Sequence, residues 1–261
     1  MIRRFAAVML MLGTAVGAPD WIDQLSPDTA GTAPPLRPFE AEYRFGWTDL
    51  EAARAKVQVE RGQDAYSVRG TGGTEGLARM LWQMDFEHTA SSSAPDFRLI
   101  EARQVERYRN RKIVTRMETR PDGFWRIREA GPDARWKRIK VSPIRDLFST
   151  MLFLRSQTLG VGDSVTTVAY PGDSPFLATV TVRSTQTLNI AGREWDALVM
   201  DLTLRRINLK KDMALEPHGR FQSGRIWLSN DPDRIPLRAE VNIFIGYVFG
   251  ELVTISFPEA G

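Results

Sequence analysis

The feature that most constrains this chain is a regular alternation of apolar and polar residues that begins at Phe39. From Phe39 to Trp47 every second residue is apolar, and a second such stretch runs over 53–60. A period of two places successive side chains on opposite faces of a β-strand, so both stretches predict half-buried strands. Further strands are predicted over 65–70, 97–108, 113–119, 124–128, 136–140, 164–170, 176–187, 195–204, 221–228, 236–245 and 248–257.

About a dozen strands in sequence, separated by short turns, predict antiparallel pairing. Turn residues such as Pro121-Asp122-Gly123 stand between several of these strands. The expected fold is mainly β: an antiparallel curved sheet or half-open β-barrel with two short covering helices. Residues 38–258 are expected to form it as a single β-domain. The 261-residue chain contains no cysteine, which excludes disulfides, thiol nucleophiles and Cys-based metal sites.

The N-terminus predicts export. Residues 1–17 combine two arginines, an uncharged apolar stretch and small residues before the expected cleavage point. This pattern is typical of a secretory signal peptide, and its apolar stretch is shorter than the roughly 20 residues that span a bilayer. No cysteine follows it, which excludes processing as a lipoprotein. Residues 18–37 are expected to form a flexible linker, and the mature protein is expected to be periplasmic and not transmembrane.

Two segments depart from the alternation and predict helices. Over 142–158, Ser142 and Pro143 provide a helix start and apolar residues follow at helical spacing. A shorter helix is predicted from Thr74. The apolar stripes consist of Ile144, Leu147, Phe148, Met151 and Leu152 in the first helix, and of Leu77, Met80, Leu81 and Met84 in the second. Each stripe is expected to lie on the sheet or in the barrel mouth.

The apolar side chains of these helices have two interpretations. They fill the core under each helix, or they line a pocket the size of a lipid acyl chain, which methionine and aromatic side chains line readily. In the second case the ligand-cavity candidates are Leu77, Met80, Leu81, Ile144, Leu147, Phe148, Met151, Leu152 and Trp227.

Charge is distributed unevenly. Without the two arginines of the signal peptide the chain is nearly neutral, which argues against a nucleic-acid partner. The segment 98–145, however, contains 15 basic and 6 acidic residues. It forms a solvated sheet face, or it attracts anionic lipid headgroups or an acidic partner. The basic-face candidates are Arg107, Arg109, Arg111, Lys137 and Arg138.

No catalytic, metal-binding or cofactor-binding motif stands out. The glycines from Gly70 to Gly76 lack the lysine of a phosphate-binding loop and predict a strand-to-helix turn. His88 and His218 have no neighbouring ligand at metal-site spacing, and no Gly-x-Ser-x-Gly motif marks a nucleophile. Asn230 to Asp233 predicts a turn and not a calcium loop. We therefore expect no cofactor, no metal and no enzyme; a hydrolase built from dispersed Ser, Asp and His residues is the minor alternative.

Two stretches, read with the opening strand, resemble a known family. They are Asp146-Leu147-Phe148-Ser149 continuing to Arg155, and Gly224 to Asp231 followed by Arg234-Ile235-Pro236 and Gly250-Glu251-Leu252. Together they resemble the bacterial family of domain of unknown function 3108 over roughly 38–255. The resemblance implies a signal peptide and a curved sheet similar to that of the periplasmic lipoprotein carrier and its outer-membrane receptor, with helices over an apolar concavity. It implies no catalytic residues.

We therefore expect a non-enzymatic periplasmic protein that binds a hydrophobic small molecule or lipid, or a cell-envelope protein. The alternative is a structural or assembly factor that acts through its sheet edge or basic face and has a packed core without a ligand.

Overall fold

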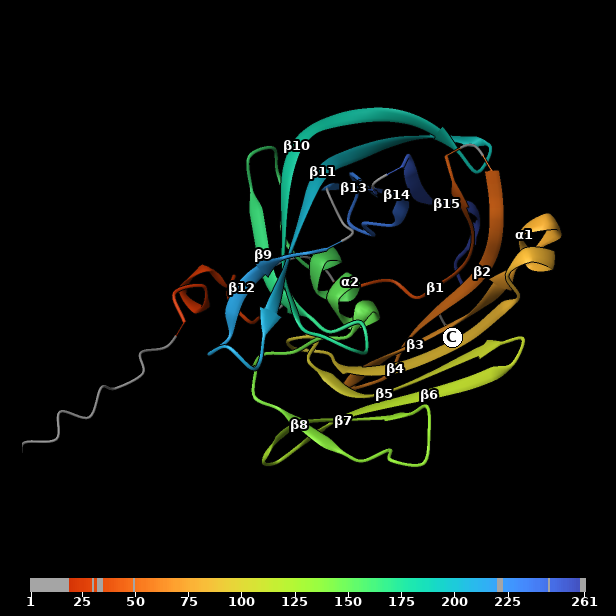
Figure 1. Ribbon diagram of the computed structural model, residues 1–261. Helices are drawn as coiled ribbons and strands as arrows, with labels where there is room; N and C mark the ends of the chain where they lie inside the picture. Colours follow the sequence, from red (N-terminus) through yellow and green to blue (C-terminus); the bar gives the residue numbers. More distant parts are fainter. Residues whose placement is uncertain are drawn as a thin grey trace, which may run out of the picture.

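The computed structural model describes residues 19–29, 31, 35–48, 50–219, 223–243 and 245–258, which form one long antiparallel sheet of 15 strands (Figure 1). The signal peptide predicted over 1–17 lies outside the described residues. The strands are β1 (Phe39–Trp47), β2 (Leu50–Arg61), β3 (Ala65–Thr74), β4 (Met84–Ser93), β5 (Leu99–Tyr108), β6 (Arg111–Arg120), β7 (Gly123–Glu129), β8 (Lys137–Ile139), β9 (Ser164–Ala169), β10 (Phe176–Ile190), β11 (Arg193–Asn208), β12 (Ala214–Pro217), β13 (Ser223–Ser229), β14 (Pro236–Asn242) and β15 (Tyr247–Ser256). The helices are the 3-10 turn η1 (Ile22–Gln24), α1 (Gly76–Leu81) and α2 (Leu147–Arg155).

The strand order is β8-β7-β6-β5-β4-β3-β2-β1-β15-β14-β13-β11-β10-β9, and β12 pairs with β11. The last strand of the chain therefore pairs with the first, and β8 and β9 form the two edges. The sheet curls around α2 without closing (Figure 1). The predicted fold class, a mainly antiparallel curved sheet, is confirmed.

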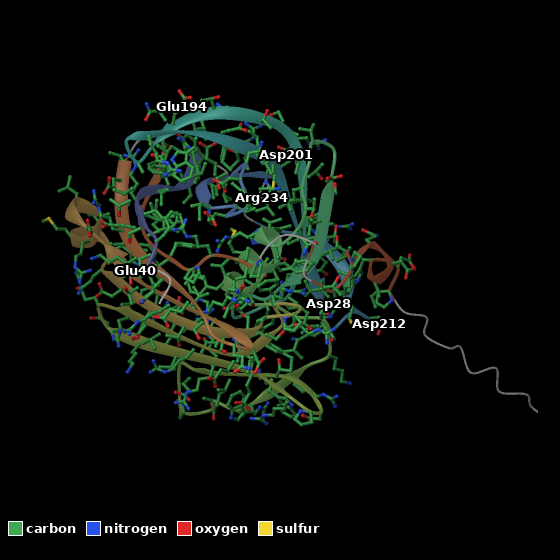
Figure 2. All side chains as sticks on the ribbon, turned by 180° about the vertical axis from the view of Figure 1, so that it is seen from behind. Asp28, Glu40, Glu194, Asp201, Asp212 and Arg234 are labelled. Carbon is green, nitrogen blue, oxygen red and sulfur yellow. The ribbon has the colours of Figure 1, made fainter. Side chains whose placement is uncertain are left out.

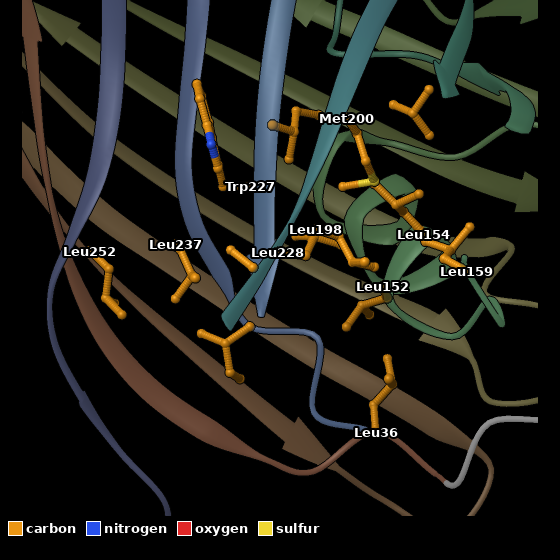
Figure 3. Packing of buried hydrophobic residues seen from close by; sticks show 14 of the residues in the cluster. Leu36, Leu152, Leu154, Leu159, Leu198, Met200, Trp227, Leu228, Leu237 and Leu252 are labelled. Atoms are coloured by element: carbon orange, nitrogen blue, oxygen red, sulfur yellow. The ribbon is translucent and has the colours of Figure 1, made fainter. Parts of the chain in front are cut away.

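The hydrophobic core lies between α2 and the concave side of the sheet. Leu152 and Leu154 of α2 are buried together with Leu198 and Leu228 of the opposing strands (Figure 3). A second cluster, formed by residues of β4–β8 at one edge of the sheet and of β9–β11 at the other, includes Met117. Burying each such side chain contributes about 1.5–3 kcal/mol, so the contacts of α2 hold both the helix and the curvature of the sheet.

Helix α2 begins five residues later than predicted. Arg145 is still extended, because its backbone pairs with Ala169, the last residue of β9, and Asp146 instead of Ser142 caps the helix. Ile144 therefore does not lie on the helix and is buried in the second core cluster. Within the described ranges no helix is long and apolar enough to cross a membrane.

Helix α1 does not cover the sheet as predicted. It has six residues, none of them buried, and it projects from the outer edge of the molecule (Figure 1). The apolar stripe predicted for this helix extends one turn too far, since Met84 already belongs to β4. In β4, Met84, Phe86 and His88 share one face of the strand. The polar residues at the end of β4 weaken the apolar–polar alternation that predicts a strand.

Gly70, Gly72 and Gly73 lie in β3, so the turn predicted from Gly70 to Gly76 occupies only the end of that stretch. A Cβ at Gly70 would lie 2.6 Å from Cζ of Phe148 of α2, and one at Gly72 would lie 2.3 Å from the backbone oxygen of Arg54. These residues are glycines because neighbouring elements approach the strand closely. The turn itself occurs at Gly76, where φ is +52°.

The segment over 18–37, predicted as a flexible linker, contacts the sheet at several described positions. Trp21 is buried and its Nε1 donates to the backbone oxygen of Met213 at 2.9 Å. Ser26 exchanges hydrogen bonds with Thr166 of β9. Asp28 lies where this segment meets the sheet (Figure 2). Burial and hydrogen bonding order this part of the segment, because an apolar tryptophan is stabilised by leaving water.

Candidate functional site

The candidate site is built around α2, whose start is fixed by the buried cap residue Asp146. The Asp146 carboxylate accepts a hydrogen bond from the backbone N–H of Ser149 at 2.8 Å and another from the Ser149 hydroxyl. A carboxylate at this position satisfies a free helix N–H and suits the positive end of the helix dipole. The sequence contained this signal, an Asp three residues before a Ser at the start of an apolar stripe.

His88 of β4 joins the cap to the sheet. Its Nε2 lies 2.7 Å from Oδ2 of Asp146, and its ring stacks on Phe148 with 4.4 Å between ring centres. Phe148 in turn fits over Gly70. Sequence reasoning missed this contact because His88 and Asp146 are far apart in the chain and neither forms a recognisable motif.

Arg145, directly before the cap, is buried and is held from several directions. Its guanidinium donates to Oγ1 of Thr167 at 3.0 Å and to the backbone oxygen of Asp96 at 2.5 Å, and it pairs with the carboxylate of Asp28. It also lies 3.8 Å from the ring centre of Phe153. Burial lowers the pKa of Arg145, and the Asp28 charge opposes that shift. These contacts tie α2 to β9, to the β4–β5 turn and to the N-terminal segment.

Arg155, at the other end of α2, is a buried cation with an unfilled donor. Nε and Nη2 donate to the backbone oxygen of Asp233 at 3.2 and 2.9 Å, and the guanidinium lies 4.8 Å from the ring centre of Phe39. Nη1 has no hydrogen-bond partner among the described residues. Burial lowers the pKa of Arg155 to about 10 and raises the pKa of nearby Tyr43.

Two apolar cavities lie on either side of α2. The first, here called the β1 cavity, has a volume of about 260 Å³, and its lining includes Phe39, Tyr43, Phe45, Met151, Arg155 and Arg238. The second, the β10 cavity, has a volume of about 240 Å³, and its lining includes Phe153, Leu154, Val180 and Leu202. Leu147, Met151 and Ile226 line both cavities. These three residues therefore stand between the two cavities, and Leu147 among them is exposed.

The structure brings together four of the predicted cavity residues and separates the other five. Leu147, Phe148, Met151 and Leu152 all line the β1 cavity. Ile144 and Trp227 are buried in the core and do not line either cavity. Leu77, Met80 and Leu81 of α1 are 79%, 71% and 87% exposed, so their assignment to the cavity was wrong. The stripe was recognised correctly, but a helical period does not say which surface faces it.

The predicted basic-face residues are all exposed but do not form one patch. Arg107, Arg109 and Arg111 lie at the β5–β6 hairpin. Lys137 belongs to the edge strand β8 and pairs with Arg126 of β7, which in turn pairs with Met117 of β6. Met117 lies six residues along β6 from Arg111. At about 3.3 Å per residue the two groups are roughly 20 Å apart.

A larger hollow of about 530 Å³ crosses β2 to β6, but its lining includes charged residues such as Glu60 and Arg69.

The polar cluster at α2 is not arranged as a catalytic triad. Asp146 stands between Ser149 and His88, whereas a nucleophilic serine needs the histidine next to it. Asp146 and Ser149 are also completely buried. Across the described residues no group of three or more His, Asp or Glu side chains is placed to hold a metal ion.

Comparison with known proteins supports the fold. A family model described as a protein of unknown function (DUF3108) matches residues 39–253. No curated protein matches the chain.

Among solved structures, the chain is similar to a β-barrel-like protein of domain of unknown function DUF1849 from Brucella abortus. The TM-score is 0.54 at 13% identity, and the match covers 86% of this chain and 99% of that one. A structure from Bacteroides fragilis, described as an exported protein with a YmcC-like fold, matches with a TM-score of 0.38 at 10% identity over 87% of this chain and 99% of its own. A structure described as a lipoprotein from Parabacteroides distasonis matches with a TM-score of 0.35 at 7% identity, over 88% of this chain and all of its own.

Proposed function

The chain belongs to the DUF3108 family of proteins of unknown function, and on that premise we propose that it is a non-enzymatic periplasmic protein that binds a lipidic molecule in the cavities beside α2. The observation that carries the proposal is the pair of apolar cavities that share Leu147 and Met151 in their lining. The periplasmic location is supported by the signal-peptide pattern over 1–17.

The size and lining of the cavities suit an aliphatic chain. Each cavity lies just below the roughly 300 Å³ at which small-molecule sites begin, and a ligand that displaces the shared side chains of Leu147 and Met151 can occupy both. Leu147, which stands between the two cavities, is 56% exposed. An apolar side chain in that position is stabilised when an apolar ligand covers it. Met151 adapts its shape readily to such a ligand.

The polar end of the ligand is proposed to be anionic. Arg155 lines the β1 cavity, and its Nη1 has no partner among the described residues but is itself buried, so an anion reaches it once neighbouring side chains shift. An uncompensated buried charge is costly, and an anion that reaches Nη1 compensates it. Arg238 lines the same cavity, but its guanidinium already bonds Glu240 and Glu251, at 2.8 and 2.7 Å. A carboxylate or phosphate at the end of an acyl chain is the chemistry that fits.

Two measurements test the proposal. Native mass spectrometry of protein purified from its own host should show a bound lipid, and a neutral apolar dye such as N-phenylnaphthylamine should bind and be displaced by dodecanoate. Leu147→Asp should weaken dye binding at least tenfold, because it places a charge between the cavities. Val161→Asp is the matched control, since Val161 is 63% exposed and lines neither cavity. Empty protein together with no dye binding would refute ligand binding and favour the assembly-factor function.

The role of Arg155 is tested by comparing dodecanoate, dodecyl phosphate and dodecanol. The wild type should bind the anions at least tenfold more tightly than the alcohol, as expected for one charge-assisted hydrogen bond. Arg155→Met should lose this preference and keep dodecanol binding, whereas Arg238→Met should keep the preference. Equal binding of all three ligands to the wild type would refute the anionic end and leave lipid binding in place.

A further inference from the structure

The exposed apolar side chains of this protein are concentrated at one end of the sheet. The tips of the β1–β2, β3–β4, β5–β6 and β14–β15 hairpins lie at this end, because Trp47 pairs with Leu50 and Val248, and Met84 pairs with Tyr108. We call this end the hairpin rim. Of the 14 large hydrophobic side chains that are exposed among the described residues, eight belong to it. They are Trp47, Leu50, Leu77, Met80, Leu81, Trp82, Ile245 and Val248.

Contacts between neighbouring tips make the rim one surface. Trp47 Nε1 donates to the backbone oxygen of Ile245 at 2.8 Å. Arg109 of the β5–β6 hairpin donates to the backbone oxygen of Met80 at 3.0 Å. The rings of Trp82 and Tyr108 lie 6.2 Å apart. The backbone of α1 is thus joined to the β5–β6 hairpin, while its apolar side chains stay exposed.

The charges of the rim favour an anionic partner. The β5–β6 hairpin carries Arg107, Arg109, Arg111 and Lys112, all exposed, against Glu106. The Glu106 carboxylate is engaged, because it accepts from the Tyr108 hydroxyl at 3.0 Å and faces Arg128. Elsewhere in and beside the rim, Arg79 pairs with Asp85 at 2.7 Å, and Arg54 pairs with Glu42 and Glu51 and faces Glu75. The excess positive charge is therefore confined to the β5–β6 hairpin.

We propose that the hairpin rim docks the protein on the surface of an anionic lipid bilayer. Leucine and methionine side chains enter the acyl boundary, tryptophans lie at the headgroup level, and the arginines of the β5–β6 hairpin attract anionic headgroups. A short exposed helix is suited to this task because none of its side chains is needed for the core.

The rim lies next to residues that line the β1 cavity. Phe45 and Gly250 pair with each other and line that cavity, and each is two residues from Trp47 or Val248 of the rim. At about 3.3 Å per residue the separation along the strand is about 7 Å. Docking through the rim therefore brings the cavity close to the bilayer, where an acyl chain can pass between them. The docking itself does not depend on the proposed ligand.

Flotation of the mature chain with lipid vesicles tests the docking. Binding is expected to vesicles of phosphatidylcholine mixed with phosphatidylglycerol, to weaken at least tenfold with phosphatidylcholine alone, and to weaken with added salt. A triple variant, Leu77→Ser with Met80→Ser and Leu81→Ser, should lose binding at least tenfold while keeping its thermal unfolding and dye binding. Val161→Ser with Ile100→Ser is the matched control, since both residues are exposed outside the rim.

Charge is tested separately. Arg109→Glu with Arg111→Glu should abolish binding to the mixed vesicles, whereas Lys137→Glu with Arg138→Glu should leave most of it. The proposal is overturned if the triple α1 variant floats as well as the wild type, or if both charge variants bind equally. It is also overturned if the wild type does not bind the mixed vesicles. If, in that case, the triple substitution converts a dimer to a monomer in sedimentation, the rim covers a second copy of the chain.

Discussion

Replacing Asp146 by alanine should destabilise the protein more than any other single loss of a carboxylate. Asp146 is completely buried, caps α2 through Ser149 and contacts His88. Loss of a cap costs about 1 kcal/mol. Leaving the Ser149 hydroxyl buried without its acceptor costs about 1–3 kcal/mol, and losing the 2.7 Å contact with His88 costs about 1 kcal/mol more. We therefore expect Asp146→Ala to lower the free energy of unfolding by about 3–5 kcal/mol, which for a domain of this size lowers Tm by about 10 °C.

Urea denaturation of a double-mutant cycle checks this value. His88→Ala, Asp146→Ala and the double variant should show a coupling energy of about 1–3 kcal/mol, because the two side chains share one buried contact. Asp146→Asn keeps an oxygen for the Ser149 N–H and should recover the cap contribution. Asp133→Ala, at an exposed turn, should change stability by less than about 0.5 kcal/mol. If Asp146→Ala costs less than about 1 kcal/mol, or if the coupling is zero, the buried contact does not hold α2 and the reasoning is refuted.

Three further predictions follow from buried contacts and are each measured by thermal or urea denaturation. Gly70→Ala should cost about 1–3 kcal/mol, because its Cβ would lie 2.6 Å from Phe148, whereas Gly131→Ala, which faces open space, should be neutral; equal effects would refute the packing argument. Trp21→Ala should cost about 3–5 kcal/mol because the indole is buried and bonds Met213, and a cost below about 1 kcal/mol would show that the N-terminal segment does not support the fold. Burial lowers the pKa of Arg155 to about 10 from its usual 12.5, so ionised Arg155 disfavours the folded state at neutral pH, and this penalty decreases as pH rises above about 10. Arg155→Met should accordingly raise Tm at neutral pH, and its advantage over the wild type should shrink above that pH; an advantage that does not change with pH would contradict this.

The apolar–polar alternation determined most of the fold, because the two faces of a strand are set by neighbouring residues. The strands from Phe39 onward were predicted close to their observed positions, and so was the one-sided helix that contains Leu147 and Met151. The strand β4 was missed because Leu77, Met80, Leu81 and Met84 also match a helical period. The residues of β3 after Gly70 were missed because a strand made of glycine has no side-chain pattern.

The candidate site was only half predictable from the sequence. The α2 residues that line the β1 cavity were recognised by their period, which is a local property. The contact between His88 and Asp146 was not, because it joins two distant segments that the strand order brings together. The sequence also could not predict that Nη1 of Arg155 lacks a hydrogen-bond partner, since this depends on which groups surround the guanidinium after folding.

The sequence by itself thus determined that this chain forms antiparallel strands and two apolar helices, since periodicity is written in consecutive residues. Only the tertiary structure decided which way those helices face. Leu147 and Met151 turn toward cavities inside the curved sheet, whereas Leu77, Met80 and Leu81 are exposed at the hairpin rim. The physical reason is that an apolar stripe is stabilised by any surface that removes it from water. The strand order places a concave sheet next to α2 and leaves the apolar side chains of α1 facing solvent.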